Sequence, residues 1–327
     1  MRALGILLVL GFLAGTPCAH PASPVASLKI GGKEYLRLSD WAAANGLKHR
    51  WLNRETVQLS NSSTKFTFVV DSREARANGV GLWLSFPAVL RDGALYLSRL
   101  DTQTTLRPLL SLPKNLSRTP LKSVCLDPGH GGSDPGNCVG TYQEKKYTLL
   151  LAHEVRQQLT RAGLQVSLTR SNDAFIDLPL RAEIARRNKA DLFLSLHFNS
   201  VATSRTVVRG AEVYCLTPVG ASSTNTRGEG ENAPGTWGNR FNNQNVFLAY
   251  TLQKALIRNP TVNDRGVHRA RFAVLRDADM PAVLIEAAFM SHPEEGKRIL
   301  DPAYRRQLAR TISDGVLAYK RAVEQNS

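Results

Sequence analysis

Four polar residues stand out, because each lies close to an apolar run and each is of a type that takes part in metal chemistry. They are His130 in VCLDPGHGG, Glu144 in TYQEKKY, His197 in LFLSLHFNS and Glu286 in AVLIEAAF. Two imidazoles and a carboxylate are what a catalytic zinc ion takes from a protein, with a fourth position left for water. A further carboxylate nearby would accept a proton from that water. The four residues therefore predict a zinc hydrolase.

Each of the four has an alternative interpretation. The glycines around His130 let the backbone bend close to an ion, but a histidine in an ordinary turn would look similar. The TYQE sequence that ends at Glu144 fits a capping box, in which the glutamate caps a helix. His197 could be a buried histidine with satisfied hydrogen bonds. Glu286 could pair with an arginine such as Arg276, because burying an unpaired carboxylate costs several kcal/mol.

The elements that would position these residues form an α/β pattern from residue 122 to 325, in which strands alternate with helices. Ligand sites in such sheets collect just beyond the strand ends. The predicted strands are Ser123–Leu126, Gln165–Thr169, Leu192–Leu196, Ala211–Leu216, Ala273–Leu275 and Ala282–Ile285. The predicted helices are 145–162, 180–190, 245–258 and 302–322, the last with Asp301 as N-cap and Pro302 at its first position.

The segments before residue 122 differ in composition. Residues 1–22 resemble a signal peptide, since Arg2 precedes an apolar run that is too short to span a membrane. Residues 26–110 predict a small α+β module, with hairpin turns at Gly31-Gly32 and Asp92-Gly93. Residues 111–121 carry two prolines and predict a linker. The fold class expected is thus one α/β catalytic domain, with a mostly parallel sheet flanked by helices, after a small α+β module.

The net charge and the cysteines indicate the surroundings in which the protein works. The formal net charge is +15 and the isoelectric point is about 10.0, which suits polyanionic surroundings. With a signal peptide, and without basic runs interleaved with aromatic residues, we expect anionic wall polymers or lipid headgroups and not nucleic acid. Cys125 and Cys138 flank His130, so a disulfide there is one interpretation. The other, which we favour, makes Cys125 and Cys215 small core residues.

Several blocks of the chain, taken in order, resemble the zinc-dependent N-acetylmuramoyl-L-alanine amidases of the type 3 family. They are LDPGHGGSDPG, Glu144 opening a helix, LPLRAEIARRNKADLFLSLHFNS and DRGVHRARFAVLRDADMPAVLIEAAFMSHPEE. The resemblance covers residues 124–319. It implies that His130, Glu144 and His197 bind one zinc ion and that Glu286 is the catalytic carboxylate. It also implies hydrolysis of the amide between N-acetylmuramic acid and L-alanine in peptidoglycan, by an enzyme exported to the periplasm or cell wall.

Two alternatives remain open: a zinc peptidase that cuts within the stem peptide, and a catalytically silent wall-binding protein. Family members often have alanine at the position of Phe198, so we expect Phe198 to narrow the cleft. The polar loop 218–243 has no apolar helical run, which leaves the need for a protein activator open. The N-terminal module resembles the small stalk-like domains first described in copper amine oxidases, and this resemblance implies a spacer or wall-binding module.

Overall fold

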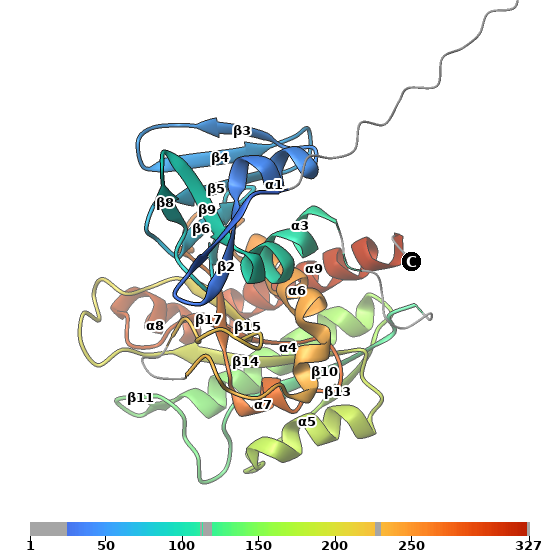
Figure 1. Cartoon of the computed structure of the whole chain (residues 1–327). Coiled ribbons are helices and arrows are strands. Elements are labelled where there is room, and N and C mark those ends of the chain that lie inside the picture. Colours follow the sequence, from blue (N-terminus) through green and yellow to red (C-terminus); the bar gives the residue numbers. More distant parts are fainter. Residues whose placement is uncertain (1–24, 112, 114–119, 226–229, 326–327) are drawn as a thin grey trace, which may run out of the picture.

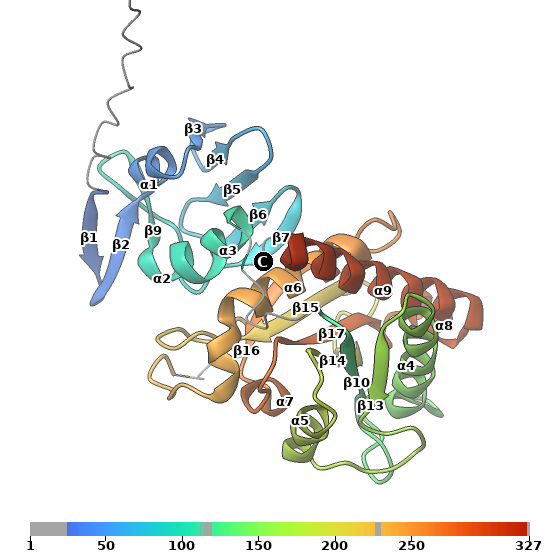
Figure 2. The same ribbon diagram turned by 90° about the vertical axis from the view of Figure 1, so that its right-hand side faces the viewer.

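A single large sheet runs through both parts of the chain (Figures 1 and 2). The computed structural model describes residues 25–111, 113, 120–225 and 230–325. The predicted signal peptide and most of the predicted linker, at 112 and 114–119, lie outside the described residues. No described helix is both long enough and apolar enough to cross a membrane.

Six strands form the catalytic part of the large sheet, in the order β13-β10-β14-β17-β15-β16. Four of the five neighbouring pairs are parallel and only β15–β17 is antiparallel, so the predicted mostly parallel sheet is confirmed. Long apolar runs form these strands because both faces are covered. Their bounds are β10 Ser123–Pro128, β13 Gln165–Leu168, β14 Leu192–Asn199, β15 Ala211–Leu216, β16 Asp264–Ala270 and β17 Ala282–Phe289.

The N-terminal module supplies the remaining five strands of the large sheet, β7-β6-β5-β4-β3, and β7 pairs with β16 at Leu82 and Val267. A second sheet, β1-β2-β9-β8, is antiparallel. The strands are β1 Ser27–Ile30, β2 Lys33–Arg37, β3 Lys48–Trp51, β4 Thr56–Ser60, β5 Lys65–Val69, β6 Glu74–Ala77, β7 Val80–Trp83, β8 Val89–Arg91 and β9 Ala94–Ser98. The module's helices are α1 Leu38–Ala44, α2 Arg99–Asp101 and α3 Arg107–Leu110, and the π-helical turn Thr102–Leu106 joins the last two.

Helices cover the catalytic part of the sheet on two faces. Buried side chains of α4, α6 and α9 form the larger core with one face, whereas α5 and α7 contribute to a smaller core on the other. The helix α9 begins as predicted, because Asp301 Oδ1 accepts a hydrogen bond from the Ala303 amide. The bounds are α4 Glu144–Arg161, α5 Leu178–Arg187, α6 Asn242–Leu256, α7 Ala273–Arg276, α8 Pro293–Leu300 and α9 Pro302–Gln325. The hairpin β11 Cys138–Val139 and β12 Tyr142–Gln143 precedes α4, and the 3-10 turn Trp237–Phe241 precedes α6.

Three sequence expectations are corrected or settled by this fold. The predicted strand at Ala273–Leu275 is wrong, because this apolar triplet forms helix α7; a run so short does not reveal its period. Phe198 does not narrow the cleft, because it is fully buried in the larger core. Cys125 and Cys215 are free and buried, as the favoured interpretation predicted, and Cys138 is free and exposed.

Candidate metal centre

His130 lies in the loop that follows β10, in a left-handed backbone conformation with φ of 62°. Gly129 precedes it at a position with no room for a side chain, since a Cβ there would lie 2.2 Å from His197 Cε1. The close approach of this backbone to the second histidine therefore requires glycine. His130 Nδ1 lies 2.8 Å from Asp134 Oδ2, which leaves Nε2 to point at Glu144.

Glu144 is the first residue of α4, yet its side chain does not cap that helix. The N-cap is Gln143 and it makes no side-chain capping bond, so the capping-box interpretation is wrong. The Glu144 carboxylate, 1% exposed, turns inward and accepts hydrogen bonds from the Asn137 backbone and side-chain nitrogens at 2.9 Å each. The Phe198 amide donates to its other oxygen at 3.1 Å.

The structure brings His130, Glu144 and His197 together. Glu144 Oε2 lies 3.1 Å from His130 Nε2, and its Oε1 lies 2.9 Å from His197 Nδ1. One ligand atom from each residue lies within 4.8 Å of the other two. Zinc bonds of about 2.1 Å in a tetrahedral site place neighbouring ligand atoms ~3.4 Å apart. The three residues thus fit a zinc ion with little rearrangement.

The electrostatics of the cluster suit a cation. Burial alone would raise the pKa of Glu144, but hydrogen bonds and charge attraction from His130 and His197 outweigh it and hold this pKa well below its ordinary value. Burial would lower the pKa of His130, yet Glu144 and Asp134 together raise it. Both effects show a site that keeps its carboxylate ionised and attracts positive charge. Metal-binding histidines typically donate their second ring N–H to a carboxylate, as His130 Nδ1 does to Asp134.

Glu286 lines the same pocket as the three candidate ligands and forms no described hydrogen bond or ion pair with any of them. It is the strand partner of His197 across β14 and β17, and its side chain faces the same pocket. Among the described residues, no group hydrogen-bonds its buried Oε2 atom, and no ion pair to Arg276 is formed, so that alternative is wrong. Burial raises the pKa of Glu286 well above its ordinary value, and the charges of Glu144 and Glu212 add to this effect.

Comparison with known proteins identifies the family to which the chain belongs. A family model described as N-acetylmuramoyl-L-alanine amidase matches residues 124–318. The chain belongs to this family. It is 36% identical over 220 residues to the N-acetylmuramoyl-L-alanine amidase AmiC of Neisseria meningitidis, a match that spans 60% of this chain and 52% of that protein. It is 34% identical to AmiA of Escherichia coli over 64% of this chain and 80% of that protein.

A solved structure agrees with this assignment. The amidase AmiC2 of Nostoc punctiforme superposes with a TM-score of 0.52 and 33% sequence identity, over 61% of this chain and 97% of that one. The match thus extends over nearly all of the Nostoc chain, which confirms the fold class predicted for the catalytic domain.

The pocket of the amidase domain has a volume of about 390 Å³. Its polar lining holds the four residues that the sequence singled out, together with Asp127, Asp134, Asn137 and Arg181. The rest of the lining is apolar and comes from α5, from β17 and from α7 with the residue before it. The residues of this apolar part are Leu178, Phe272, Ala273, Val274 and Leu284. The volume and the mixed lining are typical of ligand pockets.

Two buried arginines hold the metal loop, by which we mean residues 129–137 between β10 and β11, and the sequence alone did not single them out. Arg170 donates to the Pro128 and Gly129 carbonyls, and Arg181 donates to the Pro128 and His130 carbonyls. Arg181 also forms a buried ion pair with Asp127 at 2.8 Å. Neither had a distinctive sequence signal, because Arg170 stands in a polar run after β13 and Arg181 on a helix whose other arginines are exposed.

Proposed function

We propose that the chain is a zinc-dependent amidase that hydrolyses the amide between N-acetylmuramic acid and L-alanine in peptidoglycan. The observation that carries this proposal is the cluster of three ligand atoms within 4.8 Å, beside a carboxylate whose buried oxygen has no described hydrogen-bond partner. Membership of the amidase family selects the substrate among the amides that such a site can cleave.

Three atoms are proposed to hold the ion: His130 Nε2, a carboxylate oxygen of Glu144 and His197 Nδ1. A bound Zn²⁺ would supply Lewis acidity, which polarises an amide carbonyl and acidifies water. The Asp134 carboxylate keeps the His130 ring oriented through Nδ1. Asn137 and the Phe198 amide fix both oxygens of Glu144. The protein therefore presents its ligands already in place, which lowers the cost of binding.

Glu286 is proposed to move the proton. Its carboxylate accepts a proton from the water that attacks the amide carbon. The carbon–nitrogen bond then breaks, and Glu286 returns the proton to the departing L-alanine amine. A raised pKa suits both steps, because the base must also hold the proton until the amine leaves. Phe272 and Leu284 give the same pocket an apolar part of its lining.

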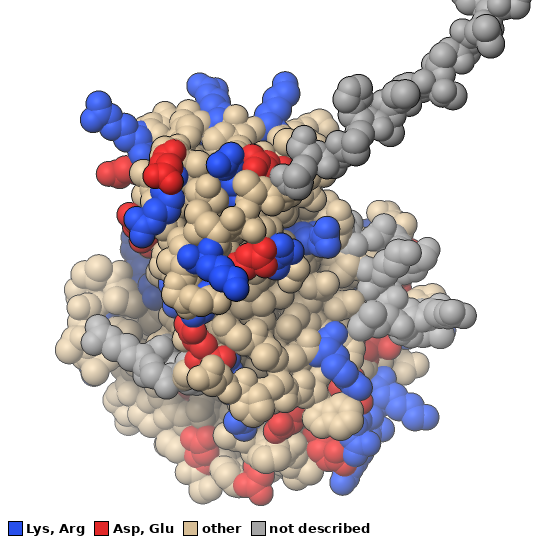
Figure 3. Space-filling model, viewed as in Figure 1, with Lys and Arg blue, Asp and Glu red and all other residues tan. Residues whose placement is uncertain are grey.

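The same proposal includes export to the periplasm or cell wall, where peptidoglycan lies. Support comes from the signal-like residues 1–22 and from related proteins described as cell wall amidases, such as LytH of Staphylococcus epidermidis, which is 33% identical over 217 residues. Lys and Arg side chains are interspersed with Asp and Glu on the face seen in Figure 3. The positive net charge thus does not gather into one basic patch on that face.

The test is digestion of purified peptidoglycan by the full chain, followed by mass analysis of the products. We expect intact stem peptides that begin with free L-alanine, and glycan strands without peptide. A chelator should stop their release and added zinc should restore it. Peptides cleaved between two amino acids would instead support a zinc peptidase, and no release under any condition would overturn the proposal.

A further inference from the structure

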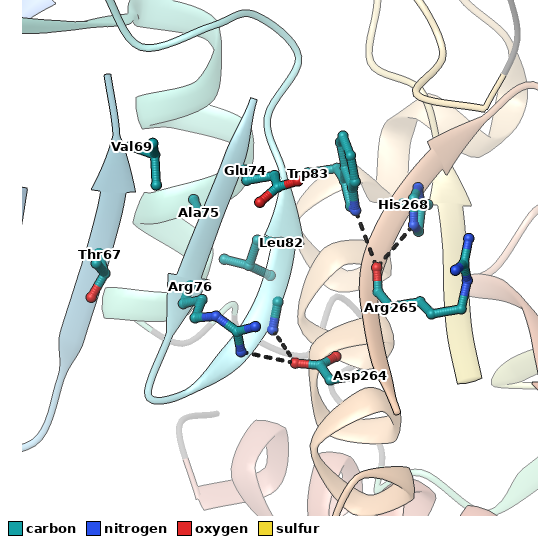
Figure 4. Close-up of a pocket in the computed structure, with 11 residues that line it drawn as sticks. Thr67, Val69, Glu74, Ala75, Arg76, Leu82, Trp83, Asp264, Arg265 and His268 are labelled. Carbon is teal, nitrogen blue, oxygen red and sulfur yellow. Dashed lines mark hydrogen bonds and ion pairs between the residues drawn. The ribbon is translucent and has the colours of Figure 1, made fainter. Parts of the chain in front are cut away.

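A second pocket, of about 370 Å³, lies where the N-terminal module meets the amidase domain (Figure 4). One side is formed by β5, β6 and β7 and the other by β16. The lining side chains that matter below are Glu74, Arg76, Trp83, Asp264, Arg265 and His268. None of them belongs to the candidate metal centre, and the proposed chemistry does not use them.

This junction pocket is on the same face of the sheet as the metal centre. The pairs His197–Glu286 and Glu286–Glu212 are in direct register, so these side chains point to one face. Arg265, which lies at the irregular start of β16, donates to Glu212 at 2.7 Å. Four strand spacings separate β14 from β7, which is a distance of about 19 Å. One extended polymer could therefore reach both places.

A row of aromatic rings joins the two pockets. Trp83 stacks on His268 with ring centroids 5.1 Å apart, His268 lies 5.1 Å from Tyr214, and Tyr214 lies 5.2 Å from Phe272. Trp83 lines the junction pocket and Phe272 lines the metal pocket. The two middle rings are buried, with Tyr214 6% and His268 7% exposed, so the row connects the pockets beneath the surface and only its end rings, Trp83 and Phe272, are open to a ligand.

Trp83 is held firmly although it is only half-buried. Its indole nitrogen donates to the Arg265 carbonyl at 3.1 Å. The strands beneath it are tightly joined, since a Cβ on Gly266 would lie 2.9 Å from the Gly81 backbone, and the Gly81 amide donates to Asp264 at 2.7 Å. A fixed aromatic ring loses little conformational entropy when a ligand packs against it.

The charges around Trp83 favour a neutral polar ligand. The lining holds two carboxylates, Glu74 and Asp264, and two guanidiniums, Arg76 and Arg265, so their formal charges cancel. Burial lowers the pKa of His268, which keeps its ring uncharged at neutral pH. A phosphate polymer or an anionic lipid surface would need an excess of positive charge. A sugar ring instead offers a C–H face that can pack on the indole ring of tryptophan. The hydroxyl and amide groups at its edge can hydrogen-bond to both carboxylates and guanidiniums.

We propose that the junction pocket binds a sugar ring of the same glycan strand whose stem peptide is cleaved at the metal centre. The inference rests on the proposed function for the identity of the polymer. It gives the N-terminal module a defined part in substrate binding, because its strand β7 supplies the aromatic platform.

The experiment measures co-sedimentation of the full chain with insoluble purified peptidoglycan, in the Glu286→Ala background so that the polymer stays intact. We expect Trp83→Ala to weaken binding about tenfold, which corresponds to ~1.4 kcal/mol. Trp83→Tyr keeps an aromatic face and should bind within about twofold of the parent. Trp51→Ala is the matched control, because Trp51 lies in the same module and lines a different surface pocket.

Unchanged binding in Trp83→Ala, or equal weakening in Trp51→Ala, would overturn the inference. A thermal melt of each variant checks folding, and Trp83→Tyr keeps the test decisive if the alanine variant is unstable. A second readout uses the Glu286-containing enzyme, for which Trp83→Ala should lower the ratio of the rate on insoluble peptidoglycan to the rate on a single-sugar muramyl peptide. Failure of the proposed function would show separately, as no release of stem peptide from either substrate.

Discussion

Replacing Asp134 by asparagine should weaken zinc binding without dismantling the metal loop. Asp134 Oδ2 contacts His130 Nδ1 at 2.8 Å, while its Oδ1 accepts the Gly136 amide at 3.0 Å. Asparagine can keep the second bond through its amide oxygen, but its NH2 group cannot accept the bond from His130 Nδ1 and carries no charge. Loss of such a partner typically costs 10–100-fold in metal affinity. Because the Asp134 side chain is 43% exposed, solvent screens its charge, and we expect about a tenfold loss, or ~1.4 kcal/mol.

Competition with a fluorescent zinc chelator would measure this loss. Asp173→Asn is a suitable control, because Asp173 accepts the Gly132 amide of the same loop at 2.8 Å but does not contact a proposed ligand. The control should bind zinc within about twofold of the wild type. If Asp134→Asn kept wild-type affinity, or if both variants lost it equally, the orienting role of Asp134 would be refuted.

Three further predictions concern the supports of the site. Gly129→Ala places a Cβ 2.2 Å from His197 Cε1, so purified protein should contain less than about a tenth of the wild-type zinc by elemental analysis. Arg181→Met leaves Asp127 buried without its ion-pair partner and should lower the free energy of unfolding in urea by about 3–5 kcal/mol. The pKa of Glu286 is raised in the folded state above its unfolded value of about 4.3. The stability that this carboxyl group contributes is therefore fully present below about pH 4.3 and is lost as the pH rises through the pKa of the folded state. Glu286→Gln should therefore raise the melting temperature of metal-free protein at pH 8 and leave it nearly unchanged at pH 4.

The sequence predicted the four central residues because their signals are local. His130 follows the end of β10 as predicted, whereas Glu286 lies within β17, which continues past the predicted end to Phe289, and both side chains line the same pocket. The role of Glu144 could not be decided from its local sequence, because a helix-starting glutamate looks the same whether it caps the helix or turns inward. The two histidines that contact its carboxylate are distant from each other in sequence, at positions 130 and 197.

Other features depended on contacts that no local pattern reveals. The segment at Ala273–Leu275 is apolar enough for a strand, but only its packing against β15 and β17 shows that it forms a helical turn. The pairing of β7 with β16 joins Leu82 to Val267 across the two parts of the chain. Nothing in either strand specifies that partner, and the junction pocket exists only because they meet.

The central claim is that three residues hold the metal ion and that Glu286 acts beside it. The most direct measurement is the zinc content per chain and the turnover of peptidoglycan in two variants, Glu286→Ala and Glu144→Ala. We predict that Glu286→Ala keeps one zinc ion per chain and releases no stem peptide, whereas Glu144→Ala loses the ion and the activity together. Turnover by Glu286→Ala, or loss of its zinc, would contradict the account.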